Sequence, residues 1–246
     1  MRKRHRHRGP DGQSEVRLRV PRRLALQGDI VTHAINLVVT LTGCCETAII
    51  SDIAVDATGT IYVVNGSLNT ANPATGACTK IGTGTVNTTG LTFLPKGVLD
   101  PAGEVLVGYD GGTYELVNVT TGKTQALGYL SKNPAVTLSS SGDLVYTRDK
   151  HLDVSMHGVG EDGKACGDCL VEADPLTGAI IKSFGDIKHA DVYGLATWGF
   201  DVFGFTNGGA FFQMHRTGET LTITDLKIPN APKAPIKFGG GATSTL

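Results

Sequence analysis

The stretch SDIAVDATGTIYVVNGSLNTANPATGACTKIGTG, from Ser51 to Gly84, decides the fold. Apolar and polar residues alternate from Asp52 to Val55 and again from Thr60 to Val64, which is typical of half-buried β-strands. Gly59 closes the turn between these two runs, and a second turn, NPATG, ends at Gly76 and leads to a last strand. The stretch therefore predicts a unit of about four short antiparallel strands.

Both turn signals recur along the rest of the chain. The second turn is the clearer one, and it ends at Gly76, Gly122, Gly178 and Gly218. The first turn is predicted to end at Gly59, Gly103, Gly142 and Gly199. A period of roughly 40–45 residues with four short strands in each unit is the signature of a β-propeller. We therefore predict inner strands that begin near Asp52, Leu91, Ala135 and Tyr193.

The third repeat is longer than the others. Roughly 17 additional residues separate its two turns, between Arg148 and Gly167. We interpret the region 149–169 as an insertion. Because surface insertions often carry specificity, we expect this region to be the most distinctive contact surface of the protein.

Two pieces of the chain lie outside these repeats. They are the β-branched runs between Gly28 and Gly43 and the C-terminal sequence IKFGGGATST. Propellers commonly close their ring with strands from both termini, which leaves no open edge. We therefore predict an all-β fold over residues 28–246, a β-propeller of five blades closed in this way. A part of a larger propeller and an irregular β-sandwich are the alternatives.

Charge is distributed unevenly along the chain. Residues 1–23 carry nine Lys and Arg and two acidic residues, whereas the remainder carries 13 Lys and Arg and 21 Asp and Glu. We predict that residues 1–27 are a disordered basic tail, or that they precede the natural start of the protein. The acidic body argues against nucleic-acid binding. No run of about 18 apolar residues predicts a membrane span, and no apolar segment after the basic start predicts a signal peptide.

Several phrases resemble known propeller families. IAVDATGTIYVV (53–64), NPATGACTKI (72–81) and DPLTGAIIKSF (174–184) are similar to the repeats of YVTN-type and SMP-30-like propellers. LDPAGEVLVGYDG (99–111), CGDCLVEADPLTG (166–178) and FGGGATST (238–245) resemble, more narrowly, a bacterial family of secreted or envelope-attached propellers without an assigned function. The resemblance covers residues 43–246.

No G-x-S-x-G, Walker, HExxH or Rossmann glycine motif occurs, and we predict a non-catalytic binding or interaction protein. By the resemblance, its location would be extracellular or periplasmic, or cytoplasmic if the chain is made as it is written. The ligand, a protein or a carbohydrate, would bind through the top loops and the 149–169 insertion, and we expect a monomer. The alternative is a metal-assisted hydrolase or lactonase of the SMP-30-like type.

Three oxygen-bearing side chains are predicted to bind a ligand or an ion. In SMP-30-like lactonases the central channel holds a divalent cation on side chains of the inner strands. Asp52, Asn133 and Asp191 enter the predicted inner strands here, and their oxygens suit a cation such as Ca²⁺. We expect structural calcium at most, no other cofactor and no catalytic residue.

Four of the five cysteines are predicted to form disulfides. Cys166 and Cys169 form a CxxC motif, which is typical of a disulfide, of structural thiols or of half a zinc site. We favour a disulfide that braces the insertion. Cys44 and Cys45 are adjacent, and one of them, with Cys44 first, is predicted to pair with Cys78 on the outer strand of the first full repeat.

Aromatic residues are dense in the fourth repeat. They alternate along it, at Trp198, Phe200, Phe203, Phe205, Phe211 and Phe212. We interpret them as the filling between neighbouring blades, not as a ligand cage.

Overall fold

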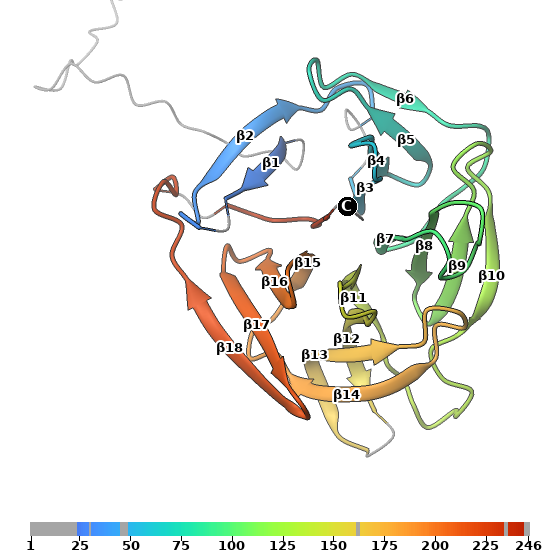
Figure 1. Cartoon of the computed structure of the whole chain (residues 1–246), viewed down its shortest axis with the longest axis vertical. Coiled ribbons are helices and arrows are strands. Elements are labelled where there is room, and N and C mark those ends of the chain that lie inside the picture. The colour runs from blue at the N-terminus through green and yellow to red at the C-terminus, as the bar shows by residue number, and fades with distance from the viewer. Residues whose placement is uncertain (1–23, 30, 45–48, 161–162, 234–235, 244–246) are drawn as a thin grey trace, which may run out of the picture.

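The computed structural model describes residues 24–29, 31–44, 49–160, 163–233 and 236–243. Within these ranges the chain forms 18 β-strands and no helix, and the strands are arranged as sheets around a central axis (Figure 1). The part of the chain that the structure describes therefore contains no helix that could cross a membrane.

Four sheets contain four antiparallel strands each, and each sheet is one blade. Blade 1 consists of β3 (Asp52–Val55), β4 (Ile61–Val64), β5 (Leu68–Ala71) and β6 (Cys78–Lys80). Blade 2 consists of β7 (Gly90–Leu94), β8 (Val105–Asp110), β9 (Thr113–Val117) and β10 (Thr124–Tyr129). Blade 3 consists of β11 (Ser139–Tyr146), β12 (Leu152–Val159), β13 (Ala165–Ala173) and β14 (Ile180–Asp186). Blade 4 consists of β15 (Val192–Trp198), β16 (Asp201–Thr206), β17 (Phe211–Thr217) and β18 (Thr220–Leu226). The prediction of an all-β propeller is confirmed.

The second turn of every blade is formed as predicted. Gly76, Gly122, Gly178 and Gly218 adopt φ values of 73°, 64°, 69° and 62°. These values lie in the left-handed region, which glycine enters at little cost. The PATG-type motif is therefore a reliable marker of the turn between the third and fourth strands.

The predicted first turn of blade 3 is wrong. Gly142 lies inside β11, and this strand begins at Ser139 instead of near Ala135. The turn that follows β11 contains Lys150, which has a φ of 70°. A Cβ atom on Gly142 would lie 2.5 Å from Cα of Tyr193 in the next blade. Gly142 is thus a contact glycine, although it looks like a turn glycine in the sequence.

The 149–169 region is mainly strand. Most of it forms β12 and the first half of β13, which pair as a long antiparallel hairpin. Leu152, Val154 and Met156 point into the main core cluster with Val171 and Ala173. The additional residues lengthen two strands because their apolar residues alternate, and they do not form a separate surface loop.

The expectation of five complete blades is also wrong. The fifth sector holds a two-stranded sheet of β1 (Leu24–Gly28) and β2 (Ile35–Thr40). Leu24–Gln27 therefore belong to a strand, whereas the sequence predicts them in the basic tail. Residues 1–23 lie outside the described residues.

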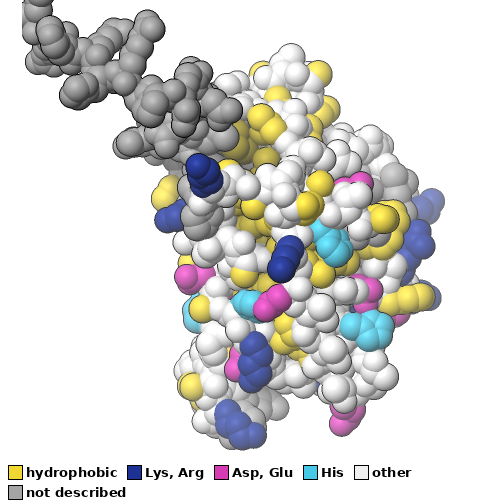
Figure 2. Space-filling model, turned by 90° about the vertical axis from the view of Figure 1, so that its left-hand side faces the viewer, with side chains coloured by type: hydrophobic (Ala, Val, Ile, Leu, Met, Phe, Trp, Pro, Cys, Tyr) yellow, Lys and Arg dark blue, Asp and Glu magenta, His cyan; other side chains and the backbone are white. Residues whose placement is uncertain are grey.

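The predicted run from Ile30 is interrupted by a turn, because Asp29 Oδ1 accepts hydrogen bonds from the N–H groups of Val31 and Thr32. On the outer side of this sector, hydrophobic side chains lie between single charged ones (Figure 2).

The C-terminal inner segment, residues 236–243, occupies the axial side of the fifth sector (Figure 1). Ile236 and Phe238 pack with Ile35 of β2 and with Phe205 of blade 4. The segment forms no strand ladder with β1 among the described residues. A cavity of about 500 Å³ remains between them, lined mainly by apolar side chains; we call it the fifth-sector cavity.

Glycines allow the inner segments to touch around the axis. In four places an added Cβ atom would come within 2.8 Å of the next segment: Gly90 on Asp143, Gly142 on Tyr193, Gly194 on Gly240, and Gly240 on Asp52. The C-terminal inner segment therefore stands between blades 4 and 1 as a fifth inner segment, and it closes the ring.

Gly241→Ala tests this closure. Its Cβ would lie 2.5 Å from the backbone oxygen of Leu195. We expect the free energy of unfolding to fall by about 1–3 kcal/mol, since overpacking against backbone cannot relax through a side chain. Gly239→Ala is the matched control, because its Cβ would meet nothing within 4 Å. Equal stability of the two variants in urea unfolding would contradict a tightly closed ring.

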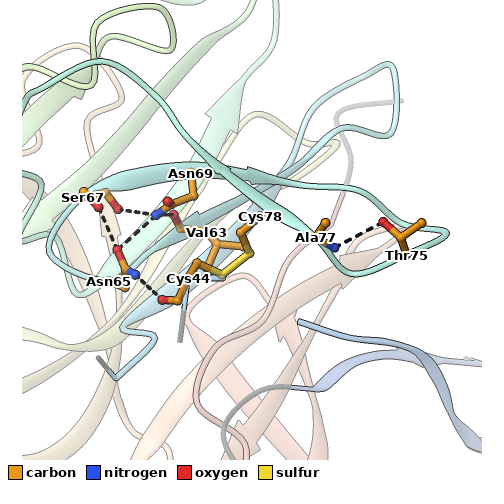
Figure 3. Close-up of a disulfide and its surroundings, with 8 residues drawn as sticks. All are labelled: Cys44, Val63, Asn65, Ser67, Asn69, Thr75, Ala77 and Cys78. Atoms are coloured by element: carbon orange, nitrogen blue, oxygen red, sulfur yellow. Dashed lines mark hydrogen bonds between the residues drawn. A yellow bond between two sulfur atoms is a disulfide. The ribbon is translucent and has the colours of Figure 1, made fainter. Parts of the chain in front are cut away.

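The disulfide between Cys44 and Cys78 ties the N-terminal region to blade 1 (Figure 3). Thr42, beyond β2, pairs in parallel with Ala77, one residue before Cys78. Beside the bridge, Asn65 Nδ2 donates to the carbonyl of Cys44, and Asn65 Oδ1 accepts hydrogen bonds from Ser67 and Asn69. The predicted pairing of Cys44 with Cys78 is therefore present, while Cys45 lies outside the described residues.

The two disulfides should differ in their effect on stability. The Cys44–Cys78 bridge spans 34 residues, and the Cys166–Cys169 bridge spans three. Loop-closure entropy predicts a loss of about 4 kcal/mol for Cys44→Ala/Cys78→Ala and about 2 kcal/mol for Cys166→Ala/Cys169→Ala. Urea unfolding of both double variants, after peptide mapping confirms the bridges in the wild type, measures the difference. A larger loss for the CxxC pair would contradict the expectation.

Candidate ligand-binding site

A broad hollow of about 1040 Å³ lies on the face of the ring where the inner strands end. We call it the ring-face cavity. Its charged and aromatic lining residues come from the ends of β11 and β15 and from the turns that follow β7 and β11, and they are Lys96, Tyr146, Arg148, Lys150 and Trp198. The described lining contains three cationic side chains and no acidic one. This face therefore carries local positive charge on a body whose sequence is acidic.

Arg216 holds the acidic residue between two of these cations. Asp149 lies between Arg148 and Lys150 in sequence, and both of its carboxylate oxygens accept hydrogen bonds from Arg216 Nη2 at 3.1 Å. Arg216 Nη1 also lies 3.2 Å from Oδ1 of Asp153. Asp149 is thereby neutralised by a residue of blade 4, and the turn that carries Arg148 and Lys150 is fixed to that blade.

The environment of Asp153 shows how much this network depends on Arg216. Burial raises the pKa of Asp153 to about 7, while the Arg216 guanidinium acts in the opposite direction. Arg216 also lies over the ring of Phe184, 5.5 Å from its centroid. The guanidinium is thus held between a buried carboxyl, an exposed carboxylate and an aromatic face.

Trp198 is the main aromatic residue of the cavity. Its side chain is 62% exposed at the end of β15, and Phe200 on the same turn is 65% exposed. Phe203, Phe211 and Phe212 are buried, as expected for side chains that fill the space around the blades. The interpretation of the whole aromatic run as filling is therefore wrong for Trp198 and Phe200, because the strand ends before their side chains can be covered.

Two carboxyl groups lie at the axis behind this face. Asp52 and Asp143 occupy equivalent positions in blades 1 and 3, both are fully buried, and a side-chain hydrogen bond joins them. Asp52 Oδ2 accepts the N–H of Leu91 at 2.6 Å, and Asp143 Oδ2 accepts the N–H of Leu195 at 2.5 Å. Each carboxyl group therefore binds the backbone of the following blade.

Burial raises the pKa of both axial carboxyl groups, but their neighbours differ. Burial raises the pKa of Asp52, and the neighbouring Asp143 raises it further. Burial also raises the pKa of Asp143, but N–H groups of Leu195, Leu144 and Gly241 stabilise its ionised form. Both oxygens of Asp143 accept N–H groups, whereas Asp52 uses only one oxygen in this way. Asp52 is thus the axial carboxyl group whose protonated form the surroundings favour more.

Asp52→Asn and Asp143→Asn should therefore behave differently. An amide at position 52 can still accept from Leu91 and donate to Asp143, so we expect stability near the wild-type value at pH 4 and above it at pH 7, where the wild type keeps a proton that its unfolded chain releases. An amide at position 143 would turn a donor toward an N–H group, so we expect a loss of about 1–3 kcal/mol. Urea unfolding measures both, and equal losses would contradict the proton assignment.

The same pair should make stability fall with rising pH. Above about pH 4 the unfolded chain releases the proton of Asp52 while the folded protein keeps it, so each pH unit costs up to about 1.4 kcal/mol until the folded pKa is reached. Asp52→Asn should remove this part of the decline between pH 4 and 8. Asp153 contributes to the decline in both proteins, so their difference isolates the axial pair.

The three predicted ion-binding residues lie in different surroundings. Asp52 is buried at the axis, where its Oδ2 accepts the N–H of Leu91. Asn133 is exposed in the connection before β11, and its Oδ1 accepts the N–H of Ala135 at 3.0 Å. Asp191 is exposed before β15, and the Tyr193 hydroxyl lies 3.4 Å from its Oδ1. The described residues contain no cluster of three or more His, Cys, Asp or Glu side chains arranged for a metal ion. A shared cation site stays a prediction.

Cys166 and Cys169 form a disulfide within β13. Cys169 pairs with Met156 of β12, and Cys166 pairs with Gly158. The register shift between these two pairs marks a bulge in the hairpin, and the bridge spans this irregular part of the strand. The disulfide interpretation of the CxxC motif agrees with the structure.

Known proteins offer only a distant comparison. No protein-family model and no curated protein matches the chain. Among solved structures, the computationally designed Ika4 protein is similar over 78% of this chain and 97% of its own, with 16% identity and a TM-score of 0.37. BamB from Moraxella catarrhalis is similar over 82% of this chain and 61% of its own, with 11% identity and a TM-score of 0.41. The extracellular domain of the one-component system BT4673 from B. thetaiotaomicron is similar over 89% and 28%, with 13% identity and a TM-score of 0.43. The propeller assignment rests on the strand order, and the resemblance to YVTN-type and SMP-30-like propellers stays a prediction.

Proposed function

We propose that this protein is a non-catalytic binding propeller of the cell envelope or exterior. The observation that carries the proposal is the ring-face cavity, a hollow of about 1040 Å³ with three cationic side chains and an exposed tryptophan. Large exposed apolar groups next to convergent polar groups are typical of ligand sites. The ligand is a protein or a carbohydrate that sits on this face, and Arg148 and Lys150 are its polar contacts.

The location outside the cytoplasm is supported by the cysteines. Four of them form disulfides, Cys44 with Cys78 and Cys166 with Cys169. Disulfides persist in oxidising compartments and are rare where thiols are kept reduced. An envelope or extracellular setting therefore suits the chain.

The non-catalytic part of the proposal is supported by the state of the axial carboxyl groups. Asp52 and Asp143 have no exposed surface, and backbone N–H groups bind both oxygens of Asp143 and Oδ2 of Asp52. A substrate cannot touch them without opening the ring. The alternative, a metal-assisted hydrolase that uses Asp52, Asn133 and Asp191 with an ion such as Ca²⁺, would require the ion to reach Asp52, whose side chain has no exposed surface.

A binding screen with paired variants tests the proposal. The wild type, Trp198→Ala and Phe200→Ala are applied to arrays of defined oligosaccharides and of defined peptides. Because Trp198 lines the cavity and the equally exposed Phe200 does not, we expect Trp198→Ala to weaken binding by about tenfold or more and Phe200→Ala to retain it.

Two outcomes would contradict the proposal. The first is a set of ligands that bind the wild type and Trp198→Ala equally well, which would move the site away from the ring-face cavity. The second is conversion of a bound ligand, which mass spectrometry of the recovered ligand detects and which would make the protein an enzyme.

A further inference from the structure

We infer that the ligand of the ring-face cavity is an anionic oligosaccharide, one whose sugar rings carry carboxylate groups. This inference rests on the proposed binding function and narrows it to one chemical class. Four observations support it: the charge of the lining, the neutralised acid beside it, the exposed indole ring and the size of the hollow.

The positive charge of the cavity lining favours an anionic ligand. Lys96 comes from the turn after β7, and Arg148 and Lys150 come from the turn after β11. Asp149, which would offset them, is engaged by Arg216 through two hydrogen bonds of 3.1 Å. The three cations thus act together on a ligand, and the planar guanidinium of Arg148 suits a carboxylate in a bidentate arrangement.

The rest of the body limits how densely charged the ligand can be. From residue 24 onward the chain carries 13 Lys and Arg against 21 Asp and Glu. A densely charged polymer such as a nucleic acid extends far beyond three cations and would meet this negative field. A chain with one carboxylate per ring places few charges and keeps them near the cavity.

The indole of Trp198 selects a ring-bearing ligand. It is the last residue of β15, in the blade next to the one that carries Arg148 and Lys150, and it is 62% exposed. An aromatic face of this kind packs on the apolar C–H face of a sugar ring while water still reaches the hydroxyl groups. A carboxylated sugar can pack on the indole with its ring and bind the cationic side chains with its carboxylate at the same time.

The size of the ring-face cavity favours an oligosaccharide over a single small anion. Its volume of about 1040 Å³ is at the upper end of the range of ligand pockets, roughly 300–1,000 Å³. A single inorganic anion would contact one cation and leave most of this space to water. Several linked rings can reach both the cationic turns and Trp198.

The single tryptophan makes the site directly measurable. The sequence contains one tryptophan, Trp198, so the intrinsic tryptophan fluorescence of the full chain reports on this cavity alone. Trigalacturonate is titrated into the protein, and its fully methyl-esterified form serves as the neutral counterpart. We expect a saturable change in fluorescence with trigalacturonate, an affinity that falls with salt, and binding of the ester about tenfold weaker or more.

Two charge-reversal variants distinguish a direct contact in the ring-face cavity from a general effect of the protein's net charge on binding. Arg148→Glu should lower the affinity for trigalacturonate by about tenfold or more, because it removes one charge-assisted contact and adds a repulsive one. Lys132→Glu makes the same change of charge on the connection before β11, at the opposite end of that strand, and should leave the affinity unchanged. Circular dichroism confirms that both variants are folded.

The outcomes distinguish this inference from the proposed function. Equal binding of the ester and the acid would overturn the anionic ligand and leave the binding propeller standing. Tighter binding of hexaglutamate than of trigalacturonate would overturn the sugar in favour of an acidic protein partner. If no anionic sugar changes the fluorescence of Trp198, the inference fails, and the array screen alone decides whether the face binds anything.

Discussion

Hydrogen bonds that buried carboxyl groups accept from backbone N–H groups of the neighbouring inner segments hold this ring together. Asp52 binds the N–H of Leu91, and Asp143 binds the N–H groups of Leu195 and Gly241. These contacts require inner strands that approach closely, which the glycines at the axis permit. The ends of the inner strands are thereby fixed, and the strand ends and turns that carry Lys96, Arg148 and Trp198 face one hollow as a result.

The axis and the ring-face cavity divide the charged groups into two kinds. Charges at the axis are buried, paired and bound to backbone, so they act on stability and on its dependence on pH. Charges at the face are exposed on turns, so they can meet a ligand. Arg216 joins a buried and an exposed carboxyl group of blade 3, because it binds Asp153 of β12 and Asp149 of the turn before it.

Structural features set by neighbouring residues, such as the turns, could be predicted from the sequence. Features that depend on residues distant in the chain could not. Gly76 and its equivalents mark turns because a positive φ is a property of one residue and its neighbours. Gly142 cannot be told from a turn glycine in the sequence, since a glycine needed for contact with Tyr193 has the same local signature. Asp143 was missed as the partner of Asp52 because they meet only when the ring closes. The sequence GDLVY does match SDIAV, and that alignment could have revealed it. The exposure of Trp198 depends on where β15 ends, which periodicity does not determine.

The C-terminal inner segment has a consequence for biosynthesis. Residues 236–243 follow all four blades in the chain, yet they complete the axis between the last blade and the first. During translation, blades 1 to 4 leave the ribosome as an open arc, and Asp143 lacks the N–H of Gly241 until the segment arrives. Compared with a ring that closes early, the growing chain therefore exposes two blade faces for longer.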